Sequence, residues 1–207
     1  MGLFDLLKGK KKIQGTIGYF DLSDWWVLEL TEEDRKYIQE KFQPLGFSSS
    51  SLTEGEITST SQTAIGLLSG LSGWFSKKQD RHIAYKIISK AEKLIGSGGN
   101  ILDVHFLYST KVDITYKDRD AIPDGLEKAI KACQQQIAYS DKAAKAFRKK
   151  YKDDLPSHKG YQQLAIVREK QKNYLEAIKI SEQALKQGWA GDWEKRIERC
   201  KKRQKNA

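Results

Sequence analysis

The feature that most constrains this chain is a pair of helical patterns between residues 157 and 203. In each pattern, apolar side chains recur every three to four residues, and a short polar break at 171–173 separates the two. Ala165, Ala177 and Ala184 stand at positions where two antiparallel helices would cross. Helix pairs with small residues at the crossing can approach closely and stack on neighbouring pairs. The sequence therefore predicts a stacking helical unit at its C-terminal end.

The same helical spacing extends upstream as far as Asp80, where a capping residue precedes the first of these patterns. Further helices are predicted at 80–95, 101–116, 123–137, 141–151 and 193–200. The chain is thus expected to be all-α, with a helical domain over 79–207.

The helix pair resembles a tetratricopeptide repeat (TPR), a family recognised by large and small residues at fixed spacing. The matching residues are Tyr161, Leu164, Ala165, Tyr174, Ala177, Ala184 and Leu185. Three positions depart from the family pattern: Arg168 and Ser181 replace aromatic residues, and Trp189 replaces a proline. A weaker sequence similarity relates residues 129–137 to residues 177–185. The predicted helix at 141–151 lies between them and interrupts a strict repeat.

The resemblance implies a TPR-like α-solenoid whose first helices line a groove for a protein or peptide. In this chain the groove positions fall on one helix face, at Lys159, Gln162, Ile166, Glu169 and Lys170. We add His105 and Tyr108, which share one face of the helix at 101–116, as partner-binding candidates. The leading hypothesis is a non-enzymatic, cytoplasmic adaptor protein.

The N-terminal part has a weaker pattern and is expected to form a basic amphipathic tail at 1–12 and a partly irregular cap segment at 13–78. Residues 13–20 combine glycines with β-branched residues, which favours a short extended segment. A capping box at Thr31–Asp34 predicts the start of a helix. The Ser- and Thr-rich stretch 47–62 is expected to be a loop. The apolar residues 63–75 contain Gly66 and Gly70 at GxxxG spacing, and they predict a buried helix that packs closely on another.

Basic charge suggests a second function, nucleic-acid binding by the helix at 141–152 together with the C-terminal tail. Residues 141–152 carry six basic side chains and one acidic one, and residues 194–207 carry seven and two. The helical pattern, however, predicts that Phe147 and Tyr151 point inward and that the lysines point outward over more than one face. The five tryptophans also lie among apolar neighbours and are expected in the interior. With no outward aromatic ring to stack on bases, the adaptor hypothesis is preferred.

Catalysis finds little support in the sequence. The three histidines and two cysteines do not match the spacing of a zinc site, no phosphate-binding glycine loop is present, and no cofactor is expected. A third hypothesis, an effector or enzyme with a site in the N-terminal segment, stays open. No apolar run approaches the ~20 residues needed to span a bilayer. Cys133 and Cys200 are expected to be reduced thiols, as in a cytoplasmic protein.

Overall fold

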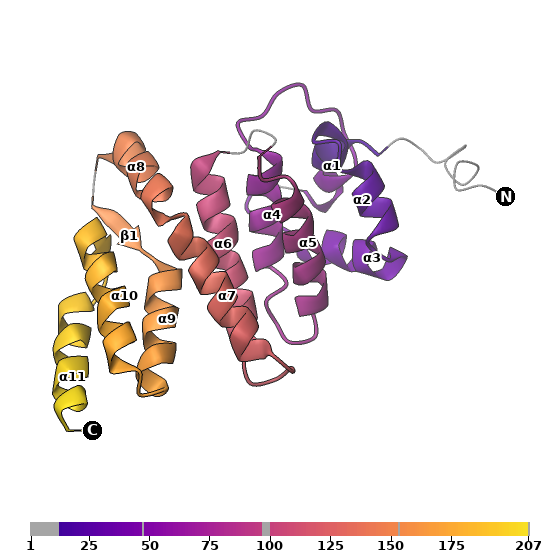
Figure 1. The fold of residues 1–207 in the computed structure, drawn as a ribbon. Helices are drawn as coiled ribbons and strands as arrows, with labels where there is room; N and C mark the ends of the chain where they lie inside the picture. Colours follow the sequence, from indigo (N-terminus) through magenta and orange to yellow (C-terminus); the bar gives the residue numbers. More distant parts are fainter. Residues whose placement is uncertain (1–12, 47, 97–99, 153, 207) are drawn as a thin grey trace. The chain divides into compact units, whose positions relative to one another are not determined.

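The computed structural model describes residues 13–46, 48–96, 100–152 and 154–206 (Figure 1). Over these residues the chain forms eleven α-helices, one short 3-10 helix and two strands of two or three residues. The prediction of an all-α protein is confirmed. The chain divides into two compact units, Met1–Ala64 and Ile65–Ala207.

The described part of the first unit is built from short helices: α1 (Gly15–Tyr19), α2 (Ser23–Leu28), α3 (Glu32–Lys41) and the 3-10 helix η1 (Ser49–Leu52). The predicted capping box is present at the start of α3. The Thr31 hydroxyl accepts a hydrogen bond from the Asp34 amide at 3.0 Å, and the Asp34 carboxylate accepts one from the Thr31 amide at 3.2 Å. Two donors that a helix start would otherwise leave unpaired are thereby satisfied.

The prediction of an extended segment at 13–20 is wrong, because residues 15–19 form the helix α1. The reason is a tertiary contact. The Gln14 amide donates to the Thr53 carbonyl, and the Gly15 amide donates to the Gly55 carbonyl. Gly15 has a positive φ of 58°, and a Cβ there would lie 2.5 Å from the Ser51 carbonyl oxygen. Only glycine allows this approach, which the pattern of β-branched residues did not show.

The stretch predicted to be a loop contains one ordered turn. Residues 49–52 form η1, and Leu52 at its end is fully buried. The Gln39 side-chain amide of α3 donates to the Thr53 hydroxyl at 2.8 Å. Buried Leu52 thus anchors a Ser-rich segment that has no periodic pattern.

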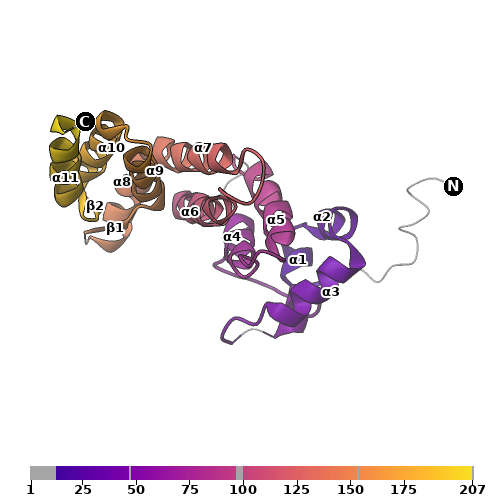
Figure 2. The ribbon, with the colours of Figure 1, turned by 90° about the horizontal axis from the view of Figure 1, so that it is seen from below.

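The second unit contains the longer helices. They are α4 (Ala64–Gly73), α5 (Arg81–Lys93), α6 (Ile101–Lys117), α7 (Gly125–Ala138), α8 (Ser140–Tyr151), α9 (Lys159–Lys170), α10 (Tyr174–Gln187) and α11 (Trp193–Lys205). Each of α6, α7, α9, α10 and α11 packs on the next one in this order. Figure 2 shows α7, α9, α10 and α11 side by side. Helix α8 leaves this order and packs mainly on α6.

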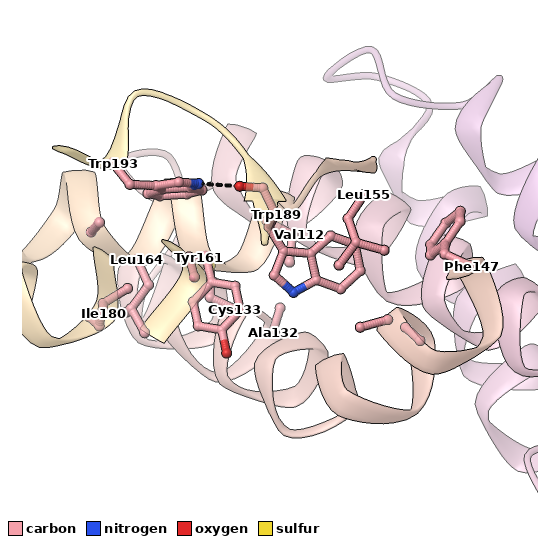
Figure 3. Close-up of a cluster of buried hydrophobic side chains, with 14 of the residues drawn as sticks. Val112, Ala132, Cys133, Phe147, Leu155, Tyr161, Leu164, Ile180, Trp189 and Trp193 are labelled. Atoms are coloured by element: carbon pink, nitrogen blue, oxygen red, sulfur yellow. Dashed lines mark hydrogen bonds between the residues drawn. The ribbon is translucent and has the colours of Figure 1, made fainter. Parts of the chain in front are cut away.

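Two short strands join the segments that precede α9 and α11. Strand β1 (Leu155–Ser157) pairs in parallel with β2 (Trp189–Ala190), and Leu155 is the partner of Trp189. Both of these side chains belong to the main buried cluster of the unit, which also contains Tyr161 and Trp193 (Figure 3). The Trp193 indole donates to the Trp189 carbonyl at 2.6 Å, which ties the start of α11 to β2.

Helix α4 is apolar and largely buried, as predicted for residues 63–75, but only one of the two glycines at GxxxG spacing makes a close approach. A Cβ at Gly66 would lie 3.2 Å from the Asp103 carboxyl carbon of α6, whereas a Cβ at Gly70 would meet nothing within 4 Å. The sequence also predicts that the helical domain begins at residue 79. This domain boundary stays a prediction, which a fragment experiment can test.

Two aromatic side chains that were expected inside lie partly outside. Tyr151, in the last turn of α8, is 49% exposed, and Trp74 is 46% exposed. The other four tryptophans are buried. Tyr151 follows the buried side of α8 in the helical pattern, but α8 ends at this residue, and Lys152 with its positive φ turns the chain away. The pattern was therefore correct for the helix face and wrong for burial at its end.

Candidate functional site

Helix α9 carries five of the seven predicted partner-binding residues, and it brings them together on one face. Because α9 is continuous from Lys159 to Lys170, the spacing of these residues places them within about a third of its circumference. Gln162 and Lys170 are exposed, and Ile166 is half-buried. Lys159 and Glu169 lie at the two ends of this face, where both make ion pairs.

Lys159 connects the face to α6. Its ammonium lies 2.8 Å from one carboxylate oxygen of Asp113 and 2.9 Å from the other. Both side chains are about 40% exposed, so water screens the pair. The contact positions Lys159 and contributes little to stability.

Glu169 connects the face to α11 through three arginines. Its carboxylate accepts hydrogen bonds from Arg196, Arg199 and Arg203, each with a shortest distance of 2.8 Å. The hydrogen bond from Arg199 is the main cause that lowers the pKa of Glu169 below its usual value. The Glu169 and Arg196 side chains are 10% and 7% exposed. Glu169 therefore acts as an internal anchor for α11, and its charge is already neutralised.

His105 lies away from the α9 face, in a buried group of aromatic rings. It is 3% exposed and stacks on Trp189, with ring centroids 5.5 Å apart and planes 2° apart. His158, at the N-cap of α9, contacts both of these rings at 5.3 and 4.7 Å. Tyr108 is half-buried on α6 and contacts the Tyr139 ring. The structure thus places five predicted site residues on the α9 face, His105 in the interior and Tyr108 half-buried on α6.

The two buried histidines are neutral at physiological pH. Burial lowers the pKa of His105 to about 4. Burial and the neighbouring His105 lower the pKa of His158 to about 3. His158 Nδ1 accepts a hydrogen bond from the Tyr161 amide at 3.3 Å, whereas His105 Nδ1 and His158 Nε2 are buried without a partner. This arrangement is suited to packing, because neither ring reaches solvent where a substrate could approach.

The third hypothesis, an effector or enzyme site in the N-terminal segment, concerns a part of the chain that contains a cavity. A cavity of about 560 Å³ in the first unit is lined in part by Trp26, Arg35 and Gln39. The Arg35 guanidinium donates to the carbonyls of Val27 and Leu30 at 3.2 and 2.7 Å, so its charge holds α2 and α3 together. No histidine or cysteine lines this cavity.

Residues that complete the α9 face were not recognisable in the sequence. Asp113 and Arg199 reach Lys159 and Glu169 from 46 and 30 residues away. The exposed rings of Phe106, beside the basic helix α8, and of Tyr151, in the last turn of α8, were also missed. No local signal identifies either set, because each depends on which helices become neighbours.

Within the described residues, no group of three or more histidine, cysteine or acidic side chains could hold a metal ion. In the same part of the chain, every helix falls short of the length and apolar character that crossing a membrane requires. Comparison of the chain with protein-family models, with curated proteins and with solved structures finds no match.

Proposed function

We propose that this protein is a non-enzymatic adaptor whose residues 79–207 form a TPR-like helical repeat array that binds a protein or peptide. The observation that carries this proposal is a spacing of 34 residues in the second unit. Helices α9 and α11 begin at Lys159 and Trp193, 34 positions apart, and the paired strand residues Leu155 and Trp189 have the same separation. A TPR motif has a period of 34 residues.

The order of packing supports the same interpretation. In a helical repeat array each helix contacts its neighbours in sequence, and terminal helices cap the stack. Helices α6, α7, α9, α10 and α11 pack serially. In this scheme α6 with α7 and α9 with α10 are two repeats, α11 is the capping helix, and α8 is an insertion.

The partner would bind along the first helices, on the α9 face defined by Lys159, Gln162, Ile166, Glu169 and Lys170. Since Lys159 and Glu169 are already paired, the contacts with a partner would come mainly from Gln162, Ile166 and Lys170. The half-buried Ile166 in the centre supplies an apolar contact between polar neighbours, which is a common composition for a peptide-binding surface. We place this adaptor in the cytoplasm, because Cys133 and Cys200 are separate buried thiols.

A selection experiment tests the proposal. The full chain is immobilised and used to select binders from a displayed library of random peptides, and the affinity of enriched peptides is measured by calorimetry. We expect Ile166→Glu to weaken binding by roughly tenfold or more, since it places a charge in the centre of the contact. Glu182→Lys, on an exposed position of α10, is the control and should bind as the unmodified chain does.

Two outcomes would contradict this function. One is a selection that enriches no peptide over an unrelated bait. The other is a peptide whose affinity changes equally in the Ile166 and Glu182 variants, because it would bind elsewhere on the protein.

A further inference from the structure

Helix α8 presents a surface that combines positive charge with exposed aromatic rings. Its basic side chains, Lys142, Lys145, Arg148, Lys149, Lys150 and Lys152, are all exposed. Two rings lie beside them: Tyr151 in the last turn of α8 is 49% exposed, and Phe106 of α6 is 48% exposed. We call these residues the α8 surface.

A buried ring holds the two exposed ones in place. Phe147 is 6% exposed, and its ring centroid lies 5.9 Å from that of Phe106 and 6.0 Å from that of Tyr151. Phe147 in turn contacts Trp189 and His105 in the interior at 5.9 and 5.3 Å. The exposed rings are therefore the outer members of a packed aromatic group, and their positions are set by the core.

Lys150 is the charge that lies beside an exposed ring, whereas Lys142, Lys145 and Lys149 lie on the other side of α8. Lys150 Nζ lies 5.1 Å from the centre of the Tyr151 ring. Lys142, Lys145 and Lys149 recur at helical spacing on the side of α8 opposite its buried residues. Arg148 donates to the Gln187 carbonyl at 2.6 Å, which fixes α8 against the end of α10. Asp141, the acidic residue at the start of α8, is engaged by the Gln187 side-chain amide at 2.8 Å.

A ligand for this surface must carry several negative charges and offer flat apolar faces. Unpaired nucleotides have both, since phosphates pair with lysines and bases stack on aromatic rings. In a duplex the bases stack on one another and are not available to surface rings. We propose that the α8 surface binds single-stranded RNA or DNA. This site is distinct from the α9 face, and the two proposals can fail independently.

The C-terminal basic residues are not part of this surface. Figure 1 shows that α8 ends on the upper side of the second unit and that α11 ends on its lower side. The last turn of α8, with Tyr151, therefore lies apart from the last turns of α11, with Lys201, Lys202 and Arg203. This separation supplies a matched control, because equal charge changes can be made at both places.

The test is a titration of the full chain with fluorescein-labelled 15-nucleotide poly(U) and poly(dT), followed by fluorescence anisotropy at two salt concentrations. The double variant Phe106→Ala/Tyr151→Ala should weaken binding by roughly tenfold or more, as expected when stacking on one or two bases is lost. Lys149→Glu/Lys150→Glu should weaken binding further. It should also make the slope of log affinity against log salt less steep, by about 0.7 for each lost phosphate contact. Lys201→Glu/Lys202→Glu should bind nearly as the unmodified chain does. Circular dichroism of each variant checks that it is folded.

Several results would overturn the proposal. Equal losses in the α8 and α11 charge variants would mean non-specific attraction to net charge. Tight binding that is unaffected by loss of the two rings would remove the stacking role. Binding to vesicles of phosphatidylcholine and phosphatidylserine that depends on the rings, without oligonucleotide binding, would assign the surface to an anionic membrane instead.

Discussion

At the scale of single residues, small side chains determine how closely the C-terminal helices approach. Ala165, Ala177 and Ala184 are all fully buried. Ala177 belongs to a cluster with Ile178 of α10 and with Ile197 and Cys200 of α11. Interiors are packed at a density that leaves no space for added atoms. The small alanine side chains therefore allow the helices to approach closely, and a larger side chain at these positions would not fit.

Replacing Ala177 with glutamate should destabilise the protein strongly. The new carboxylate would have to be buried without a partner or push the helices apart, so we expect a loss of about 2–4 kcal/mol in the free energy of unfolding. Glu182→Ala, on the exposed side of the same helix, should change it by less than about 0.5 kcal/mol. Urea denaturation measures both values, and similar small effects would show that α10 is not packed at Ala177.

The buried histidines make stability depend on pH. In the unfolded chain each histidine has a pKa near 6.5, whereas the folded values are about 4 for His105 and about 3 for His158. Below pH 6.5 the unfolded state therefore binds more protons than the folded state. We therefore expect the free energy of unfolding to decrease as the pH falls from 6.5 towards 4, by about 2 kcal/mol for each histidine at pH 5.

Urea denaturation at pH 7 and pH 5 checks this prediction. His105→Phe keeps an aromatic ring beside Trp189 and removes one titrating group, so the loss between the two pH values should be roughly halved. A pH dependence that is the same in the unmodified chain and the His105 variant would contradict the role of His105.

At the scale of helices, α11 is held by an apolar stripe and by one carboxylate. Trp193, Ile197 and Cys200 are buried along the inner side of α11. On a neighbouring side, Arg196, Arg199 and Arg203 converge on Glu169. Removing one partner from a buried ion pair costs more than the pair itself contributes, because the remaining charge stays buried.

Glu169→Gln should loosen α11 selectively. It leaves buried Arg196 with only the longer contact of 3.7 Å to the Asp192 carboxylate, and we expect a loss of about 2–3 kcal/mol. Arg203 is more than half exposed, and Arg203→Gln should cost less than about 1 kcal/mol. Hydrogen exchange should show faster exchange in α11 for the Glu169 variant alone. Equal protection of α11 in both variants would mean that the apolar stripe is sufficient.

At the scale of the whole molecule, the chain has two compact units that divide at residue 64. The second unit contains the serially packed helices, both proposed surfaces and the main buried cluster. Helix α4 is also part of this unit, and its Leu67, Leu68 and Leu71 are buried. A fragment that lacks α4 therefore tests whether the remaining helices of this unit fold without it.

We expect a fragment of residues 79–207 to unfold cooperatively, since α5 to α11 bury one another. A fragment of residues 65–207 should have a higher melting temperature, because it keeps α4 and the close contact between Gly66 and Asp103. Thermal melts followed by circular dichroism compare the two. A molten 79–207 beside a cooperative 65–207 would show that α4 completes the core.

The sequence by itself determined the helices of the second unit, since apolar spacing and alanines are local properties that need no knowledge of neighbours. It also located the capping box at Thr31 and the buried side of α8. Only the tertiary structure decided the helix at residues 15–19, which depends on backbone contacts with residues 51–55. It also decided that Glu169 is neutralised, that His105 is internal and that Tyr151 is exposed. These properties depend on which distant segments become neighbours, and helical periodicity carries no information about that.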